Sequence, residues 1–191
     1  MIMRIFILLG HPNHTTLSAA LADRYEAAAK AAGHEVRRMN IGELSFDPIL
    51  WKGYQVRQDL EPDLVAVQEN LSWCEHFVLV YPNWWGSMPA LLKGMWDRMF
   101  LPRFAFRMWP SRWGWDRLLK GRTARVFILC GNPPIVDRFA FGNYTAAIGW
   151  SILRFAGFKT KITSFGPSER APESRIEKWK RKVDSLARKG R

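Results

Sequence analysis

Residues 77–94 read FVLVYPNWWGSMPALLKG, and their character changes in the middle. The run 77–81 is continuously apolar, β-branched and aromatic, which predicts a strand buried on both faces of a parallel sheet. Pro89 can open a helix, because the backbone N–H that it lacks has no partner at a helix start. The segment between them, 82–88, is therefore predicted to be a loop at the carboxyl end of a buried strand, where ligands bind in open α/β sheets.

Strand and helix patterns alternate through the rest of the chain. Further strands are predicted at 5–9, 34–39, 125–130 and 159–165, and helices at 17–32, 63–74, 89–100, 144–155 and from 172 onward. Segments 40–61 and 101–121 show no regular period. This alternation predicts an α/β fold of the flavodoxin-like, doubly wound kind: a five-stranded parallel sheet in three α/β/α layers, forming a single domain over 1–191.

Composition narrows the class of protein. The longest apolar runs have five to six residues, far below the roughly 20 that span a bilayer. Cys74 and Cys130 have no C-x-x-C spacing, which favours a cytoplasmic protein without disulfides. The net charge is +12, and residues 101–191 contain 20 Lys and Arg against 6 Asp and Glu. We interpret this excess as a solvated basic surface and expect no nucleic-acid partner.

Three of the predicted loops meet at one edge of the sheet. The first, 10–18, is rich in hydroxyls and leads into a helix, which suits either a phosphate site or a helix cap. It matches neither G-x-x-x-x-G-K-[ST] nor G-x-G-x-x-G. The loop 82–88 offers two adjacent tryptophans beside a glycine, and the loop after 125–130 begins with Gly131 and Asn132. Together these loops suit a planar heteroaromatic ring with a phosphate.

In these loops the chain resembles the flavodoxin-like NAD(P)H:quinone oxidoreductases, a family that includes ancillary quinone reductases of bacterial potassium-efflux systems. Residues 10–18, GHPNHTTLS, look like the phosphate loop of that family. Residues 81–94 look like its flavin loop, and 95–100 with 104–106 look like the helix and tail that follow. The resemblance spans nearly the whole chain.

The resemblance implies a bound flavin, FMN or alternatively FAD, and NADPH or NADH as electron donor. By resemblance the cofactor-binding residues are His11, Thr16, Leu17 and Ser18 at the phosphate, Pro82, Asn83, Trp84, Trp85 and Gly86 at the isoalloxazine, and Gly131 in the fourth loop. The substrate would lie against Phe104, Phe106 and Trp109. No metal is implied, and His14, His34 and His76 have no metal-ligand spacing.

The activity implied is hydride transfer from NAD(P)H through the flavin to a quinone, nitro or azo compound, with no catalytic side chain. The chain departs from the family in its fourth loop, which reads Leu129-Cys130-Gly131-Asn132 where the family usually has Thr-Thr-Gly-Gly. It also lacks the His that some members place, with a Tyr, after that loop. The alternative is therefore a flavin-binding regulatory subunit of a membrane transport system, with little turnover of its own.

Two further expectations concern surfaces. Residues 101–115 carry much aromatic surface, and in the resembled family such a segment borders the active site of a partner, so we expect a homodimer. Asp97 and Arg98 are neighbours in a predicted helix, and we expect them to form a surface ion pair.

Overall fold

The computed structural model describes residues 2–110 and 113–191, and its centre is one parallel sheet. The strands are β1 (Arg4–Leu9), β2 (Glu35–Asn40), β3 (His76–Pro82), β6 (Thr123–Leu129) and β7 (Lys159–Phe165). Their order is β2-β1-β3-β6-β7, and every neighbouring pair is parallel. This confirms the predicted five-stranded sheet and places its topological switch point between β1 and β3.

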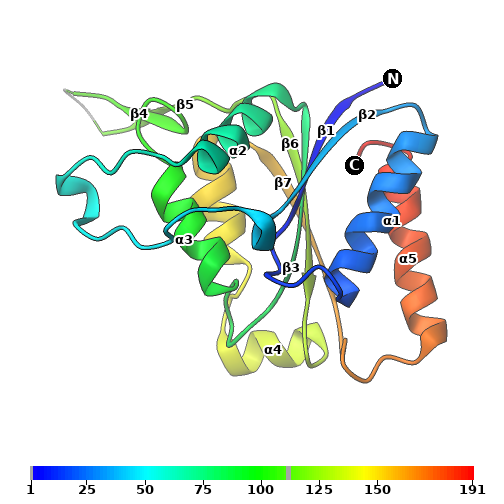
Figure 1. The fold of residues 1–191 in the computed structure, drawn as a ribbon. Helices are drawn as coiled ribbons and strands as arrows, with labels where there is room; N and C mark the ends of the chain where they lie inside the picture. The colour runs from blue at the N-terminus through cyan, green and yellow to red at the C-terminus, as the bar shows by residue number, and fades with distance from the viewer. Residues whose placement is uncertain (1, 111–112) are drawn as a thin grey trace.

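Helices cover both faces of the sheet, as Figure 1 shows. One face carries α1 (Leu17–Ala31) and α5 (Glu173–Ala187), and the other carries α2 (Pro62–Trp73), α3 (Ala90–Met99) and η3 (Ala147–Arg154). The predicted three layers are thus present, although η3 is a π-helix where an α-helix was expected. Over the described residues, no helix is both long and apolar enough to cross a membrane.

The central strands are apolar without interruption because both of their faces are covered. Phe6 and Leu8 of β1 pack toward α2 and α3, whereas Ile5 and Ile7 pack toward α1 and α5. All seven residues of β3 are buried. The edge strand β2 has no fully buried residue, and exposed and partly buried residues alternate along its first half, as expected for a strand at the sheet edge.

The sequence analysis missed a short antiparallel strand pair and a short helix. Segment 101–121 contains an antiparallel pair, β4 (Phe106–Met108) with β5 (Trp115–Arg117). Strands of three residues are too short to display a period. A helix, α4 (Pro134–Phe141), follows the fourth loop and begins at the second of two prolines.

The expected surface pair of Asp97 and Arg98 is wrong. Asp97 instead binds Lys93 one turn earlier, at 2.7 Å, and the Arg98 side chain is fully buried. The Arg98 guanidinium donates to the Glu61 carboxylate at 2.9 and 3.0 Å and to the Asp59 carbonyl at 2.8 Å. These bonds fasten the irregular segment 44–61 to α3, which helix periodicity alone does not indicate.

Replacing Arg98 tests this fastening. Arg98→Met leaves the Glu61 carboxylate and two backbone carbonyls without their donor. We expect the free energy of unfolding to fall by about 3 kcal/mol, the lower end for breaking a buried pair, since Glu61 is partly exposed. Lys93→Met is the matched control, because it removes an exposed i,i+4 pair worth about 0.5 kcal/mol. Equal urea midpoints for the two variants would contradict the assignment.

Candidate cofactor site

The loops that follow β1, β3 and β6 meet at the carboxyl edge of the sheet, beside α4 at the lower end of Figure 1. The His11 ring packs edge-on against Trp84, with ring centroids 5.4 Å apart, and joins the first loop to the third. Trp85 meets Phe141 of α4 in the same geometry at 6.4 Å. The structure therefore brings together the residues predicted to bind a cofactor, although they come from three separate parts of the sequence.

The first loop ends in a capped helix start. Asn13 Oδ1 accepts hydrogen bonds from the Thr15 backbone N–H and from the Thr15 hydroxyl, each at 2.8 Å. Thr16 is the N-cap of α1, and its hydroxyl oxygen accepts from the Ala19 N–H at 3.3 Å. The hydrogen bonds among the described residues leave the N–H groups of Leu17 and Ser18 without a partner. Two free donors at a helix N-terminus suit an anion.

His11 lies at the entrance to this loop as a neutral ring. Partial burial is the main cause that lowers the pKa of His11. Its Nδ1 accepts a hydrogen bond from the Asn13 N–H at 2.9 Å, so the neutral imidazole carries its proton on Nε2. The ring therefore offers one N–H donor beside the free N–H groups of α1.

The third loop is a tight turn with an aromatic residue at its tip. Trp84 and Ser87 exchange two backbone hydrogen bonds, at 2.8 and 3.0 Å. The two central residues have positive φ, 51° at Trp85 and 74° at Gly86, as in a type I′ turn. Positive φ is uncommon for a bulky residue. It leaves the Trp85 side chain 91% exposed, as a flat apolar wall.

A buried carboxylate ties the third loop to the fourth. Asp137 of α4 is 2% exposed and accepts hydrogen bonds from Asn83 Nδ2 at 2.9 Å and from Asn132 Nδ2 at 3.0 Å. Asn83 Oδ1 and the Tyr81 hydroxyl are buried and have no partner in the described structure. Sequence reasoning missed Asp137, because α4 itself was not predicted and a lone Asp after two prolines carries no motif.

The remaining groups of the fourth loop are neutral or open. Burial raises the pKa of the Cys130 thiol and of the Tyr144 hydroxyl, each to about 12, so both stay protonated at neutral pH. A Cβ added to Gly131 would approach only Glu169 Oε1, at 3.8 Å, which leaves its backbone accessible to a ligand.

Within 2–110 and 113–191, no three His, Cys, Asp or Glu side chains are grouped to hold a metal. The arrangement suits binding of a planar ring and offers no activated nucleophile.

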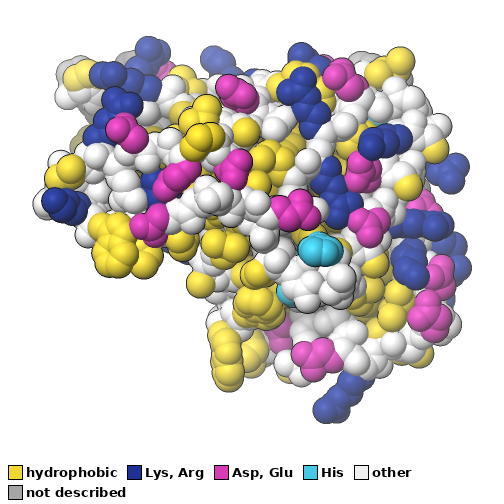
Figure 2. Space-filling view, in the orientation of Figure 1, with side chains coloured by type: hydrophobic (Ala, Val, Ile, Leu, Met, Phe, Trp, Pro, Cys, Tyr) yellow, Lys and Arg dark blue, Asp and Glu magenta, His cyan; other side chains and the backbone are white. Residues whose placement is uncertain are grey.

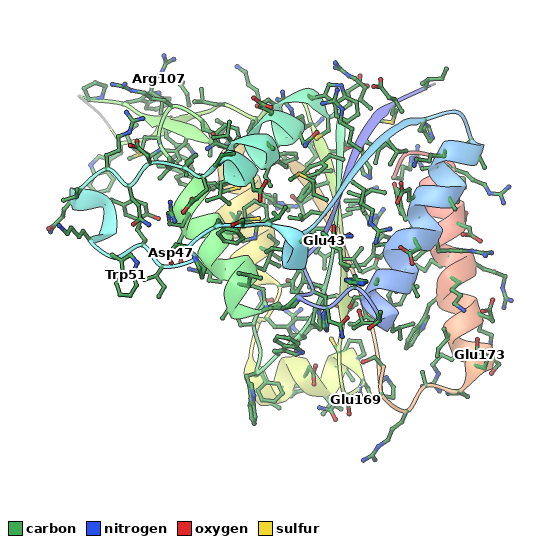
Figure 3. The ribbon with its side chains drawn as sticks, viewed as in Figure 1. Glu43, Asp47, Trp51, Arg107, Glu169 and Glu173 are labelled. Carbon is green, nitrogen blue, oxygen red and sulfur yellow. The ribbon has the colours of Figure 1, made fainter. Side chains whose placement is uncertain are left out.

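The predicted substrate residues lie elsewhere in the same chain. Phe104 and Phe106 line a cavity of about 710 Å³ between segment 50–60 and the end of α3. Trp109 is close by in sequence and donates its indole N–H to Asp116 at 3.1 Å. Figure 3 shows the separation: Arg107, next to Phe106, lies at the upper edge, and Glu169, near Gly131, lies at the lower edge. One chain therefore does not bring these three aromatics to the loops.

Comparisons of sequence agree with this architecture. A family model described as having a flavodoxin-like fold matches residues 3–185. The uncharacterized NAD(P)H oxidoreductase YcaK of Escherichia coli is 30% identical over 104 residues, which cover 51% of this chain and 52% of the relative. The chain thus spans about half the length of YcaK. NAD(P)H dehydrogenase [quinone] 1 of Rattus norvegicus is 23% identical over 216 residues, 97% of this chain and 78% of the relative.

Solved structures share the fold. Smu.1420 from Streptococcus mutans superposes with a TM-score of 0.85 at 26% identity, over 98% of this chain and all of the other. An FMN-dependent NADH-azoreductase from Bacillus anthracis, solved with FMN, gives a TM-score of 0.75 at 17% identity, over 99% of both chains. With the family model covering nearly the whole sequence, the chain belongs to the flavodoxin-like fold family, among the relatives of the NAD(P)H:quinone oxidoreductases.

Proposed function

We propose that this protein is a flavin-dependent oxidoreductase, which binds FMN at the three loops and passes a hydride from NAD(P)H to a quinone, nitro or azo compound. The observation that carries the proposal is the meeting of free helix-start donors with an aromatic turn at the carboxyl edge of the sheet. The names of the relatives support it, since they include an NAD(P)H oxidoreductase, a quinone dehydrogenase and an FMN-dependent azoreductase.

The residues present fit FMN. The N–H groups of Leu17 and Ser18 and the Nε2–H of His11 would hold the phosphate, with Thr15 and Thr16 hydroxyls around them. FMN is preferred to FAD because the azoreductase that shares this fold is named as FMN-dependent.

The ring would be bound by the other two loops. Trp84 and Trp85 would wall the isoalloxazine, with Pro82 and Gly86 shaping their turn. The unpartnered Asn83 Oδ1 would accept a hydrogen bond from its polar edge. Gly131 would let the backbone of the fourth loop approach it.

In the proposed reaction the bound flavin supplies the hydride chemistry. The residues of the three loops would orient the flavin and shield it. His11 is neutral, so it adds no charge at the phosphate site. Cys130 is a protonated thiol, so it offers no nucleophile toward the ring. The exposed Trp85 side chain offers the same apolar wall to the nicotinamide and then to the acceptor, so both substrates use one pocket in turn.

A second candidate function is a flavin-binding subunit with a regulatory role on a membrane transport system. Two observations favour it. The helix α4, which follows the fourth loop, carries the buried Asp137 and no His. The exposed side of α5 is also basic, and Figure 2 shows dark blue side chains over the α5 side of the molecule. Steady-state turnover separates the two functions.

We further infer a homodimer. Phe104 and Phe106 line the cavity beside the C-terminal end of α3, whereas the loops lie near its N-terminal end, so these two residues would reach a flavin site only in a second copy. Large apolar side chains are exposed around them: Trp51 is 68%, Tyr54 71% and Met108 57% exposed, and Trp113 is fully exposed. Sedimentation velocity at micromolar concentration is expected to show a dimer. A monomer alone would contradict both the dimer and the substrate role of these aromatics.

The function is tested directly by reconstitution with FMN. We expect the purified protein to bind FMN and, with NADH or NADPH, to reduce a soluble benzoquinone. Absorbance after gel filtration measures the bound flavin, and nicotinamide oxidation measures turnover. Bound FMN without turnover would favour the regulatory function. If neither FMN nor FAD binds, both candidate functions fail.

Thr16→Asp tests the phosphate site. Asp is as good an N-cap as Thr, so α1 keeps its cap, but the variant places a carboxylate where the phosphate must lie. Charge-assisted hydrogen bonds contribute roughly 1.5–3 kcal/mol each, so FMN affinity should fall by about tenfold to a hundredfold. Ser174→Asp, in the first turn of α5, is the control and should leave affinity unchanged. A folded Thr16→Asp protein with parental affinity would remove this loop from the site.

A further inference from the structure

Asp137 is a buried carboxylate without a cation. It is 2% exposed, and none of the ion pairs found among the described residues includes it. Its two oxygens are used instead by amides, Oδ2 by Asn83 and Oδ1 by Asn132. Buried charges are costly and are normally paired. Asp137 lies between the two loops that flank the proposed ring site, and its burial without a cation there indicates a role at that site.

The carboxylate decides how the Asn83 amide is turned. The two ends of an Asn amide have the same shape, but only Nδ2 can donate, and it donates to Asp137 Oδ2 at 2.9 Å. Asn83 Oδ1 is thereby directed away from Asp137, and it is buried without a partner. An unpaired buried acceptor costs about 1–3 kcal/mol unless something donates to it. The isoalloxazine ring has one N–H on its polar edge, and that group is the complementary donor.

Asp137 is also the charge nearest to this amide. The neighbouring polar groups of β3, β6 and the residues after α4 are neutral: the Tyr81 hydroxyl, the Cys130 thiol and the Tyr144 hydroxyl. Among the described contacts, no Lys or Arg side chain bonds to Asp137 or Asn83. Asp137 is therefore the charged group in hydrogen-bond contact with the Asn83 amide.

We propose that Asp137 is a positioning residue for the flavin, whose carboxylate holds Asn83 Oδ1 toward the ring N–H and whose charge disfavours the reduced ring. This rests on the proposed function. Hydride transfer gives the ring two electrons and one proton and leaves the nicotinamide oxidised. The Asp137 carboxylate would oppose the negative charge that the flavin gains on reduction. The protein would then bind oxidised flavin more tightly than reduced flavin and favour transfer of the hydride to the acceptor.

The test is Asp137→Asn, measured by FMN titration and by potentiometry of the bound flavin. Loss of the fixed acceptor frees the Asn83 amide to turn, so the dissociation constant of oxidised FMN should rise at least tenfold. Loss of the charge should raise the affinity for reduced FMN about tenfold relative to the affinity for oxidised FMN. For a two-electron couple that factor raises the reduction potential by about 30 mV.

Two other variants separate the roles. Asn83→Ala removes the acceptor and keeps the carboxylate. It should lower the affinity for oxidised FMN about tenfold and leave the ratio of the affinities for reduced and oxidised FMN as in the parent. Asp97→Asn removes an exposed carboxylate of α3 and should change neither quantity. If Asp137→Asn does not fold, Asn83→Ala still decides the positioning role, because parental FMN affinity there would overturn it.

The outcomes also distinguish this inference from the function on which it rests. A parent protein that binds no flavin overturns both. A parent that binds FMN, together with a folded Asp137→Asn protein whose affinity and potential match those of Asp97→Asn, overturns the inference and leaves the proposed function standing.

Discussion

The parallel, in-register pairing of β1, β3 and β6 is the constraint on which the rest of the structure depends. Leu9 lies opposite Val80, and Tyr81 lies opposite Ile128, so the three strands end at the same edge. The ladder continues into the loops, where the Gly10 N–H donates to the Val80 carbonyl at 2.8 Å and the Asn83 N–H to the Leu129 carbonyl at 2.7 Å. This backbone alignment brings three loops that are distant in sequence together at one edge, where we propose the cofactor site.

Two buried ionic groups then hold the irregular parts in place at opposite ends of α3. In the last turn of α3, Arg98 joins segment 44–61 to the helix through a carboxylate and two carbonyls. Near its N-terminal end, Asp137 joins the loops after β3 and β6 through two amides. Segments without regular hydrogen bonding need such anchors, because little else compensates for the conformational entropy that they lose. The first anchor is structural, and the second lies beside the proposed ring.

Two groups of aromatic side chains lie at opposite ends of α3. Trp84 and Trp85 stand at the loops, whereas Phe104 and Phe106 stand at the other end of α3 around a cavity of their own. A helix of ten residues is about 15 Å long, and side chains at its two ends do not wall one ring. The chain therefore presents the proposed cofactor site at one end of α3 and an apolar surface at the other, and from this arrangement we infer a dimer.

Local pattern was enough to predict the sheet, its helices and the first and third loops. Continuous apolar runs such as 77–81 identify strands buried on both faces, and Thr16 and Pro89 mark the helices that follow. Parallel strands must place their carboxyl ends together, so the residues of the site could be predicted from sequence once the strands were known. Their roles toward FMN came from resemblance and remain predictions.

Only the tertiary structure decided what the irregular segments do. Arg98 was taken for a surface residue because a helical period does not reveal which helix residues are covered by a loop 37 residues earlier in the chain. Asp137 could not be predicted because its function as an anchor depends on Asn83 and Asn132 arriving from two loops, and no spacing encodes that meeting. The sequence determines which faces must be buried, since burial of apolar side chains follows local periodicity. The pairing of buried charges depends on distances between remote segments, and these exist only in the folded chain.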